Sequence, residues 1–145
     1  MTSRITPVSN AQIPARKFDF QGSGHPNGNV TQVIVAVGID IVEIARIEKA
    51  IQRKEFAEKL FSPDELRDAN EAGHVAGRWA AKEAIAKALP IKIAWRDIEV
   101  LNHESGAPYV RFNDKVEIKS GWRIHISITH EKGYAAAVAV LEDSS

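Results

Sequence analysis

The stretch that most constrains the fold is residues 122–130, where apolar and polar side chains alternate without interruption. The apolar positions are Trp122, Ile124, Ile126 and Ile128, and the polar positions are Arg123, His125, Ser127 and Thr129. Because successive side chains of a strand point to opposite faces, this pattern predicts a strand with one buried and one polar face. A short turn at residues 131–133 leads into a largely apolar stretch, residues 134–141. The two stretches together predict an antiparallel hairpin.

The rest of the chain mixes strands and helices in no regular alternation. Residues 30–42 predict a strand, and helices are expected from residue 44, from residue 63 and over residues 77–89. Ser62 and Glu65 have the spacing of a capping box at the start of the second helix. Short strands at residues 98–100 and 108–112 enclose a turn at residues 102–106. We therefore predict an α+β fold, a mostly antiparallel sheet packed with helices.

The N-terminal part of the chain differs from the rest. Residues 21–29, QGSGHPNGN, gather glycine, proline and asparagine and predict a loop or linker. The residues before them show no sustained helical or strand period. We expect residues 1–30 to form a flexible N-terminal extension and residues 31–145 to form one domain with a core of its own.

Composition excludes several classes of protein. Lys plus Arg equals Asp plus Glu at 19 each, whereas a nucleic-acid-binding domain usually carries a basic excess. No apolar run approaches the roughly 20 residues that span a bilayer, and no secretory signal is recognisable. There is no cysteine, which excludes disulfides and thiolate chemistry. We expect a cytoplasmic protein with no nucleic-acid or membrane partner.

Asp40 is the first candidate functional residue, since it interrupts an apolar strand. An unpaired carboxylate in such a place is costly. Taken alone, Asp40 is better explained as a residue at a strand end that faces solvent or caps the next helix.

The helix over residues 77–89 is the second candidate, because its charges do not gather on one face. Glu83 and Lys87 project on another side of the helix from Arg78, about 140° and about 180° round it at about 100° per residue, whereas Lys82 lies near Arg78. Alone, the helix is explained as an alanine-rich packed helix with an exposed Glu83–Lys87 pair. The third candidate is the polar face at residues 123–130, which is equally explained as a solvent-exposed surface.

Considered together, these features predict chemistry at phosphate. Asp40 and Glu83 could hold one Mg²⁺, which typically takes one or two protein carboxylates and completes its shell with waters and phosphate oxygens. Arg78, Lys82 and Lys87 would meet the remaining phosphate charge. No P-loop or GxGxxG motif is present, so a common nucleotide-binding fold is not supported.

Five segments resemble the holo-acyl-carrier-protein synthase type of 4′-phosphopantetheinyl transferase. They are GIDIVE at 38–43, FSPDEL at 61–66, GRWAAKEAIAKAL at 77–89, DIEV at 97–100 with GAPY at 106–109, and HISITH at 125–130. They occur in the family's order, from about residue 35 to residue 141. The resemblance implies the 4′-phosphopantetheinyl transferase fold and Mg²⁺-dependent transfer of the phosphopantetheine arm of coenzyme A to a serine of an apo acyl carrier protein, with release of 3′,5′-ADP.

The resemblance also implies roles for individual residues. Asp40 and Glu83 match the metal ligands, and Glu83, directly or through a metal-bound water, is the candidate base. Lys87 matches a lysine that neutralises or protonates the leaving phosphate. Arg78, Lys82 and His125 match positions around the coenzyme A phosphates. Family members commonly form trimers with active sites between subunits, so His125 could serve a neighbour's site.

The first helix carries the residues expected to bind the carrier, which is usually acidic. Arg46 matches a carrier-facing arginine of the family, and Lys49 and Arg53 continue that face; a solvated surface explains the latter two equally well.

The chain departs from the family after Leu89. Family members usually carry a glycine-rich loop there that lies against the coenzyme, but residues 90–95 contain no glycine. The alternative is therefore a non-catalytic relative that binds carrier protein or coenzyme A without transfer. Which carrier is modified, in fatty-acid synthesis, polyketide synthesis or another pathway, is left open.

Overall fold

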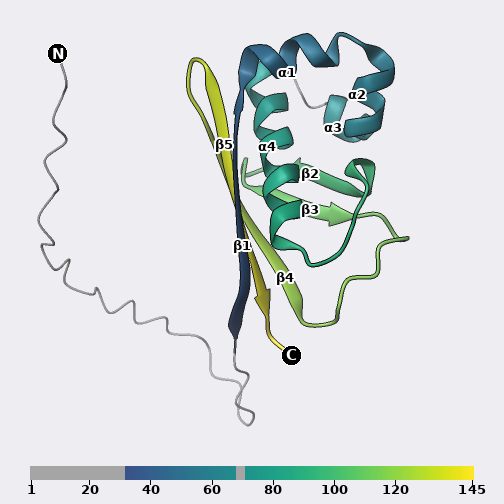
Figure 1. Cartoon of the computed structure of the whole chain (residues 1–145), viewed down its shortest axis with the longest axis vertical. Coiled ribbons are helices and arrows are strands. Elements are labelled where there is room, and N and C mark those ends of the chain that lie inside the picture. The colour runs from purple at the N-terminus through teal and green to yellow at the C-terminus, as the bar shows by residue number, and fades with distance from the viewer. Residues whose placement is uncertain (1–31, 68–70) are drawn as a thin grey trace, which may run out of the picture.

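A three-stranded antiparallel sheet organises the protein. The computed structural model describes residues 32–67 and 71–145; the predicted extension, residues 1–30, lies outside the described residues. Strand β5 (Tyr134–Asp143) lies between β1 (Val33–Glu43) and β4 (Trp122–His130), as Figure 1 shows. The predicted hairpin is confirmed, with His130 opposite Ala135 and Trp122 opposite Asp143.

Helix α4 (Ala72–Ala88) packs against one face of this sheet. Four of its alanines are buried in one core cluster with apolar residues of β4 and β5, namely Ala80, Ala81, Ala84 and Ala88. The helix begins five residues before the predicted start at residue 77. The two glycines near its start are accommodated because the helix lies close to β4: a Cβ on Gly77 would come within 2.8 Å of Ile128 Cγ2. Small side chains thus bring α4 onto the sheet.

Strand β1 also passes very close to α4. A Cβ at Gly38 would lie 1.9 Å from the backbone oxygen of Ala84, so no other residue fits there without a shift of the backbone. This contact places Asp40, two residues further along β1, beside the C-terminal half of α4.

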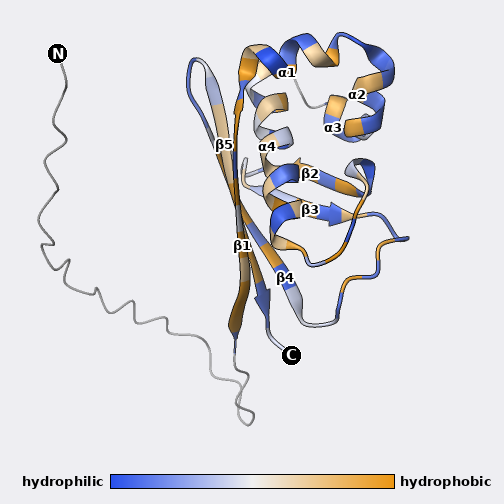
Figure 2. Cartoon of the chain, in the orientation of Figure 1, coloured by the Kyte–Doolittle hydropathy of each residue, from blue (hydrophilic) through white to orange (hydrophobic). Residues whose placement is uncertain are grey.

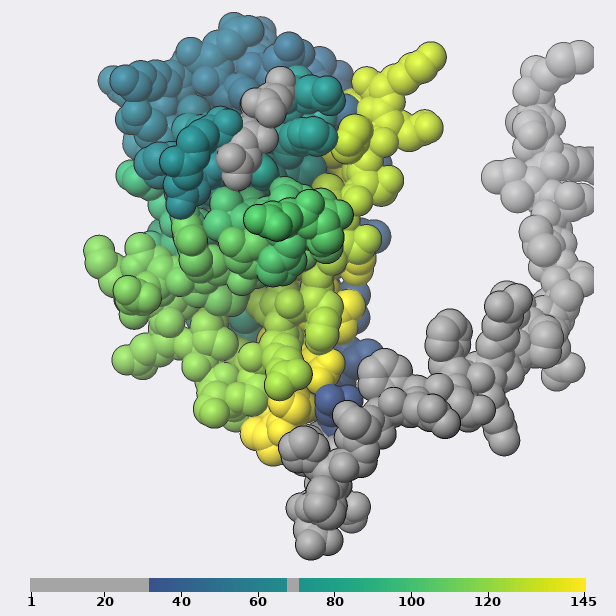
Figure 3. Space-filling model, turned by 180° about the vertical axis from the view of Figure 1, so that it is seen from behind, coloured from purple at the N-terminus to yellow at the C-terminus, as the bar shows by residue number. Residues whose placement is uncertain are grey.

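Three short helices lie together at one end of the molecule, as Figures 1 and 3 show. They are α1 (Ile44–Ile51), α2 (Lys54–Leu60) and α3 (Pro63–Arg67). The predicted capping box is confirmed: the Ser62 backbone N–H donates to Glu65 Oε2 at 2.8 Å, and the Glu65 N–H donates to Ser62 Oγ at 3.3 Å. None of these helices, nor α4, is long and apolar enough in the described ranges to cross a membrane.

A second, two-stranded sheet covers another side of α4. A single 3₁₀ turn, η1 (Trp95–Asp97), leads into β2 (Ile98–Asn102), which pairs with β3 (Pro108–Phe112) in antiparallel register. Gly106 has φ +86° in the turn between them, a conformation that glycine adopts most easily.

The outer face of the three-stranded sheet has no helix over it among the described residues. Along β1 it exposes large apolar side chains. Figure 2 accordingly colours most of β1 as hydrophobic. The exposed side chains are Val33, Val35, Val37, Ile39 and Ile41, with between 47% and 68% of each residue exposed. A single continuous row of this kind is typical of a surface that meets another protein.

Candidate functional site

Asp40, Glu83 and Lys87 meet where β1 passes α4. Lys87 Nζ donates to Asp40 Oδ1 at 2.8 Å and to the backbone oxygen of Ile39 at 3.0 Å. The Asp40 side chain is 16% exposed, so the ammonium compensates a carboxylate that is largely withdrawn from water. The N-cap of α1 is Glu43, so Asp40 does not cap that helix. The structure pairs Lys87 with Asp40, where the sequence alone suggested Glu83 as its partner.

The proton affinities of this cluster are mutually dependent. Burial raises the pKa of Glu83 above its ordinary 4.5, and the nearby Asp40 raises it further, against the opposing effect of Lys87. The hydrogen bond to Asp40 raises the pKa of Lys87. Glu83 therefore accepts a proton more readily than an exposed glutamate, while Lys87 stays charged at neutral pH.

A cavity of about 290 Å³ joins the two carboxylates to an apolar region. Asp40 and Glu83 line its polar side. Trp79, Phe56 and Leu60 line the apolar side. Arg46, on α1, lines it as well. The cavity thus joins an acidic end, an apolar wall and a basic edge.

The predicted carrier-binding residues share one surface, although not one helix. Helix α1 ends at Ile51, and Arg53 is the N-cap of α2. Arg46, Lys49 and Arg53 nevertheless line the same shallow pocket of about 400 Å³. Because Arg46 also lines the carboxylate cavity, the basic surface is continuous with the site.

Lys82 is not at this site. Its side chain is fully buried, and Nζ donates to the Leu60 backbone oxygen at 2.5 Å, to Glu65 Oε2 at 2.7 Å and to the Trp95 backbone oxygen at 2.9 Å. Burial lowers the pKa of Lys82, and the Glu65 carboxylate partly offsets this. An ammonium group has three N–H donors, and all three are used within the chain. The structure therefore places Lys82 in the core, with its three donors bound to oxygen atoms of the chain.

Arg78 lies on a different side of α4, about 140° from Glu83 by helical angle. It lines a second cavity of about 460 Å³ between α4, the β2–β3 turn and β4. Arg78 is only 5% exposed, and within residues 32–67 and 71–145 no carboxylate forms an ion pair with it. The cavity therefore offers an uncompensated guanidinium to a ligand.

His125 belongs to neither cavity. It lies on the outer face of β4, where Nε2 is 3.0 Å from Glu142 Oε2. The other histidine of the same motif, His130, packs edge-on against His74 with ring centroids 5.6 Å apart, and His74 lines the Arg78 cavity. His130 therefore lies nearer to that cavity than His125 does.

Sequence reasoning missed two residues of the Arg78 cavity, His74 and Asn102. His74 lies in the first turns of α4, before the predicted start of the helix. Asn102 was assigned only to a turn, although a polar residue where a strand ends is a common place for a binding group.

Comparison with known proteins identifies the family. Residues 36–139 match the 4′-phosphopantetheinyl transferase superfamily, and the chain belongs to it. It is 42% identical over 123 residues to the holo-[acyl-carrier-protein] synthase of Oceanobacillus iheyensis, an alignment covering 76% of this chain and 98% of that relative. The predicted resemblance is thereby confirmed.

Solved structures agree with the fold. The holo-(acyl-carrier-protein) synthase of Bacillus anthracis, in complex with CoA (3′,5′-ADP), is 36% identical, with a TM-score of 0.65 and coverage of 77% of this chain and 98% of that one. The synthase of Helicobacter pylori, in complex with coenzyme A, is 34% identical, with a TM-score of 0.65 and coverage of 72% and 98%. The predicted α+β phosphopantetheinyl transferase fold is confirmed.

Proposed function

We propose that this protein is a holo-acyl-carrier-protein synthase, which transfers the 4′-phosphopantetheine group of coenzyme A to a serine of an apo acyl carrier protein. The observation that carries the proposal is the cluster of Asp40, Glu83 and Lys87 beside a cavity bordered by Arg46. Relatives of this name cover most of the chain, and one solved relative is a complex with CoA (3′,5′-ADP). The lack of cysteine supports the cytoplasm as the place of this reaction.

The donor set fits Mg²⁺. Among the described residues no group of three or more His, Cys, Asp or Glu side chains could hold a metal ion. Two carboxylates are therefore what this cavity offers, and Mg²⁺ is commonly held by one or two carboxylates with substrate phosphates. Asp40 and Glu83 would hold the ion, which would supply charge neutralisation and polarisation at the pyrophosphate.

The side chains of the cluster have different roles in the transfer: one accepts a proton and another neutralises negative charge. Glu83 takes the proton of the carrier serine, whose oxygen forms a bond to the phosphorus attached to the pantetheine arm. The bond from that phosphorus to the bridging oxygen breaks, and 3′,5′-ADP leaves with the bond's electron pair. Lys87 lies one helical turn from Glu83 and neutralises the phosphate of the leaving group. The raised pKa of Glu83 makes its carboxylate a better proton acceptor for this step.

The complete site includes a neighbouring subunit in a homotrimer. Within one subunit Arg78 and Glu83 line separate cavities, about 140° apart round α4. The apolar row on β1 supplies a surface that another copy could cover. In this assembly the Arg78 cavity of one subunit faces the carboxylates of the next. His125 lies at the interface, because it is on the same outer sheet face as the apolar row of β1.

The carrier protein is acidic and binds the surface of Arg46, Lys49 and Arg53. All three side chains are exposed, and their charges attract an acidic partner and speed its encounter. Because Arg46 also borders the carboxylate cavity, a carrier bound there brings its serine toward Glu83.

The test is transfer to a panel of apo carriers with coenzyme A and Mg²⁺, followed by intact-protein mass spectrometry. We expect a mass increase of one phosphopantetheine group on at least one carrier with the wild type. Glu83→Gln should lower the rate by at least about a hundredfold, because it removes the general base. Glu117→Gln, the same change at an exposed position outside the described cavities, should not alter the rate.

Two results would count against the proposal. Binding of coenzyme A or carrier by the wild type without transfer to any carrier would favour the non-catalytic alternative. Full activity of Glu83→Gln would remove Glu83 from the mechanism.

A further inference from the structure

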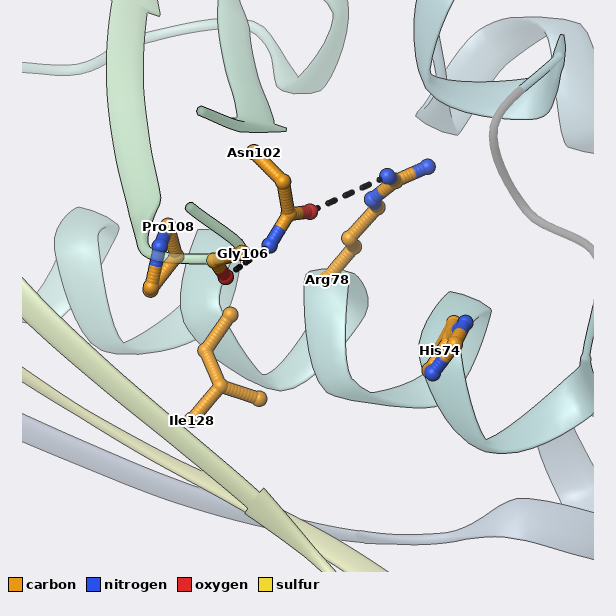
Figure 4. Close-up of a pocket in the computed structure, with 6 residues that line it drawn as sticks. All are labelled: His74, Arg78, Asn102, Gly106, Pro108 and Ile128. Carbon is orange, nitrogen blue, oxygen red and sulfur yellow. Dashed lines mark hydrogen bonds between the residues drawn. The ribbon is translucent and has the colours of Figure 1, made fainter. Parts of the chain in front are cut away.

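The Arg78 cavity is built around a chain of hydrogen bonds that joins three parts of the fold. Figure 4 shows its lining, with Arg78 and His74 from α4, Ile128 from β4, and the others from the end of β2, the turn after it and the start of β3. The others are Asn102, Gly106 and Pro108. The lining mixes a buried cation with an apolar wall, as many sites for small organic anions do.

The guanidinium of Arg78 is held by two neutral acceptors. Nη1 donates to the backbone oxygen of Glu65, and Nη2 donates to Asn102 Oδ1 at 3.3 Å. A guanidinium has five N–H donors, so three remain after these two bonds. The two acceptors fix the plane of the group without neutralising it, and the side chain lines the cavity.

Asn102 is the only side chain among these contacts, and both ends of its amide are engaged. Its Oδ1 accepts from Arg78, and its Nδ2 donates to the backbone oxygen of Gly106 at 2.8 Å. Gly106 occupies the left-handed turn between β2 and β3, with φ +86°. The amide is thus oriented by the turn, and through Oδ1 it orients Arg78 (Figure 4).

The chemical character of Asn102 matters as much as its position. A neutral amide can accept from an arginine and leave the full positive charge in place. An aspartate there would also accept, but it would pair with the guanidinium and cancel much of its attraction for an anion. The residue at 102 therefore sets both the direction and the effective charge of Arg78.

We propose that Asn102 is a positioning residue, which aims the guanidinium of Arg78 at a phosphate group of the ligand in this cavity. The proposal rests on the proposed function, which makes that ligand coenzyme A. Asn102 itself does not take part in the transfer chemistry. Its loss should therefore weaken coenzyme A binding much more than it slows the chemical step.

The test compares Asn102→Ala and Asn102→Asp with Ser105→Ala in the full-length protein. Ser105 belongs to the same turn, and its Oγ accepts from the Ala107 N–H at 3.4 Å; it does not line the cavity. Ser105→Ala therefore disturbs the turn without touching Arg78. Each variant is measured for the Kd of coenzyme A by calorimetry, for KM and kcat in the transfer assay, and for thermal unfolding.

We expect Asn102→Ala to raise both the Kd and the KM for coenzyme A about tenfold, the size of a lost hydrogen bond to a charged group. The kcat should fall less than about twofold, since no transition-state contact is removed. Asn102→Asp should bind more weakly still, although it keeps an acceptor for Arg78. Ser105→Ala should bind and turn over like the wild type, and the exposed position of residue 102 predicts little change in Tm for any variant.

Several outcomes would overturn the proposal. These are unchanged KM and Kd in Asn102→Ala, wild-type affinity in Asn102→Asp, or an equal loss of affinity in Ser105→Ala, which would mean that only turn integrity matters. If the wild type binds coenzyme A but transfers nothing, the proposed function fails, while the Kd comparison still decides the role of Asn102. If the wild type does not bind coenzyme A, both proposals fail.

Discussion

Lys82→Met is the sharpest test of how the core around the site is held. The substitution keeps an unbranched apolar stem but removes an ammonium that donates three hydrogen bonds in a fully buried position. It leaves the Glu65 carboxylate, also fully buried, without its counter-ion. Glu65 would keep only the N–H donors of Ser62 and Val100.

The expected loss follows from this uncompensated charge. Breaking a buried ion pair by removing one partner typically costs about 3–5 kcal/mol, a large part of the roughly 5–15 kcal/mol by which a domain is stable. Urea unfolding followed by tryptophan emission reports on it directly, because the rings of Trp79 and Trp95 are 4.9 Å apart beside this network. Protein concentration must be held fixed, since the proposed assembly would contribute to the apparent stability.

Two control variants test whether the uncompensated buried charge causes the loss of stability in Lys82→Met. Lys87→Met makes the same change five residues along α4, where 52% of the side chain is exposed, and should destabilise far less. The double variant Lys82→Met, Glu65→Gln removes the buried charge as well and should be more stable than Lys82→Met alone. A loss below about 1 kcal/mol in Lys82→Met would refute the reasoning, as would a double variant that is less stable than the single one.

Three further predictions follow from the structure. Gly38→Ala should lower the free energy of unfolding by about 1–3 kcal/mol, because the new Cβ would lie 1.9 Å from a carbonyl oxygen of α4. An unchanged Tm would contradict this. Hydrogen bonds from Arg111 lower the pKa values of both Glu99 and Asp64 in the folded state. The unfolded chain therefore takes up protons first, and the free energy of unfolding should fall as the pH drops through 4.5 and 3.8, the ordinary pKa values of the two groups. Stability that stays constant down to about pH 2 would contradict it. In the proposed trimer, subunits of Glu83→Gln and Arg78→Gln, unfolded and refolded together in equal amounts, should recover about a quarter of wild-type transfer, since random assembly would join the two intact halves at that share of the interfaces. If mixing restores no more activity than the separately refolded variants show, each site lies within one subunit.

The elements that the sequence predicts best are those determined by side chains close together in the chain. The alternation at residues 122–130 fixes which face of β4 is buried, because a slip of one residue would put Ile124 and Ile126 in water. The capping box of Ser62 and Glu65 satisfies N–H groups within four residues. Such features need no knowledge of the rest of the fold, and the structure confirms them.

The meeting of Asp40 with Lys87 could be predicted only in part. Helical spacing places Glu83 and Lys87 on one face of α4, but it does not say that β1 crosses that face. The missing information is the close approach at Gly38, which depends on the packing of a strand against a helix 46 positions later at Ala84. Sequence analysis paired Asp40 with Glu83 because two carboxylates can share one Mg²⁺, and the family resemblance implied the same pair.

Lys82 shows what helical periodicity alone cannot predict. Periodicity assigns a side chain to a side of its element, but not to what covers that side. Lys82 shares its side of α4 with Arg78, yet the end of α2, α3 and η1 close over it, and its ammonium satisfies oxygen atoms from all three segments. The sequence identified Glu65 only as part of the capping box, and its pairing with Lys82 appears only in the structure.

The segment after α4 is where the resemblance led us to expect a glycine-rich loop, and residues 90–95 contain no glycine. Leu89, Ile91 and Ile93 pack against the core, whereas the residues between them are exposed. The backbone of Trp95 accepts from Lys82 and its ring packs on Trp79, a residue of the carboxylate cavity. Alternate apolar side chains thus hold an extended segment where a glycine loop would be free to follow a ligand. Because this segment packs against the core, we propose that side chains, Arg78 among them, bind the anion in place of a glycine loop.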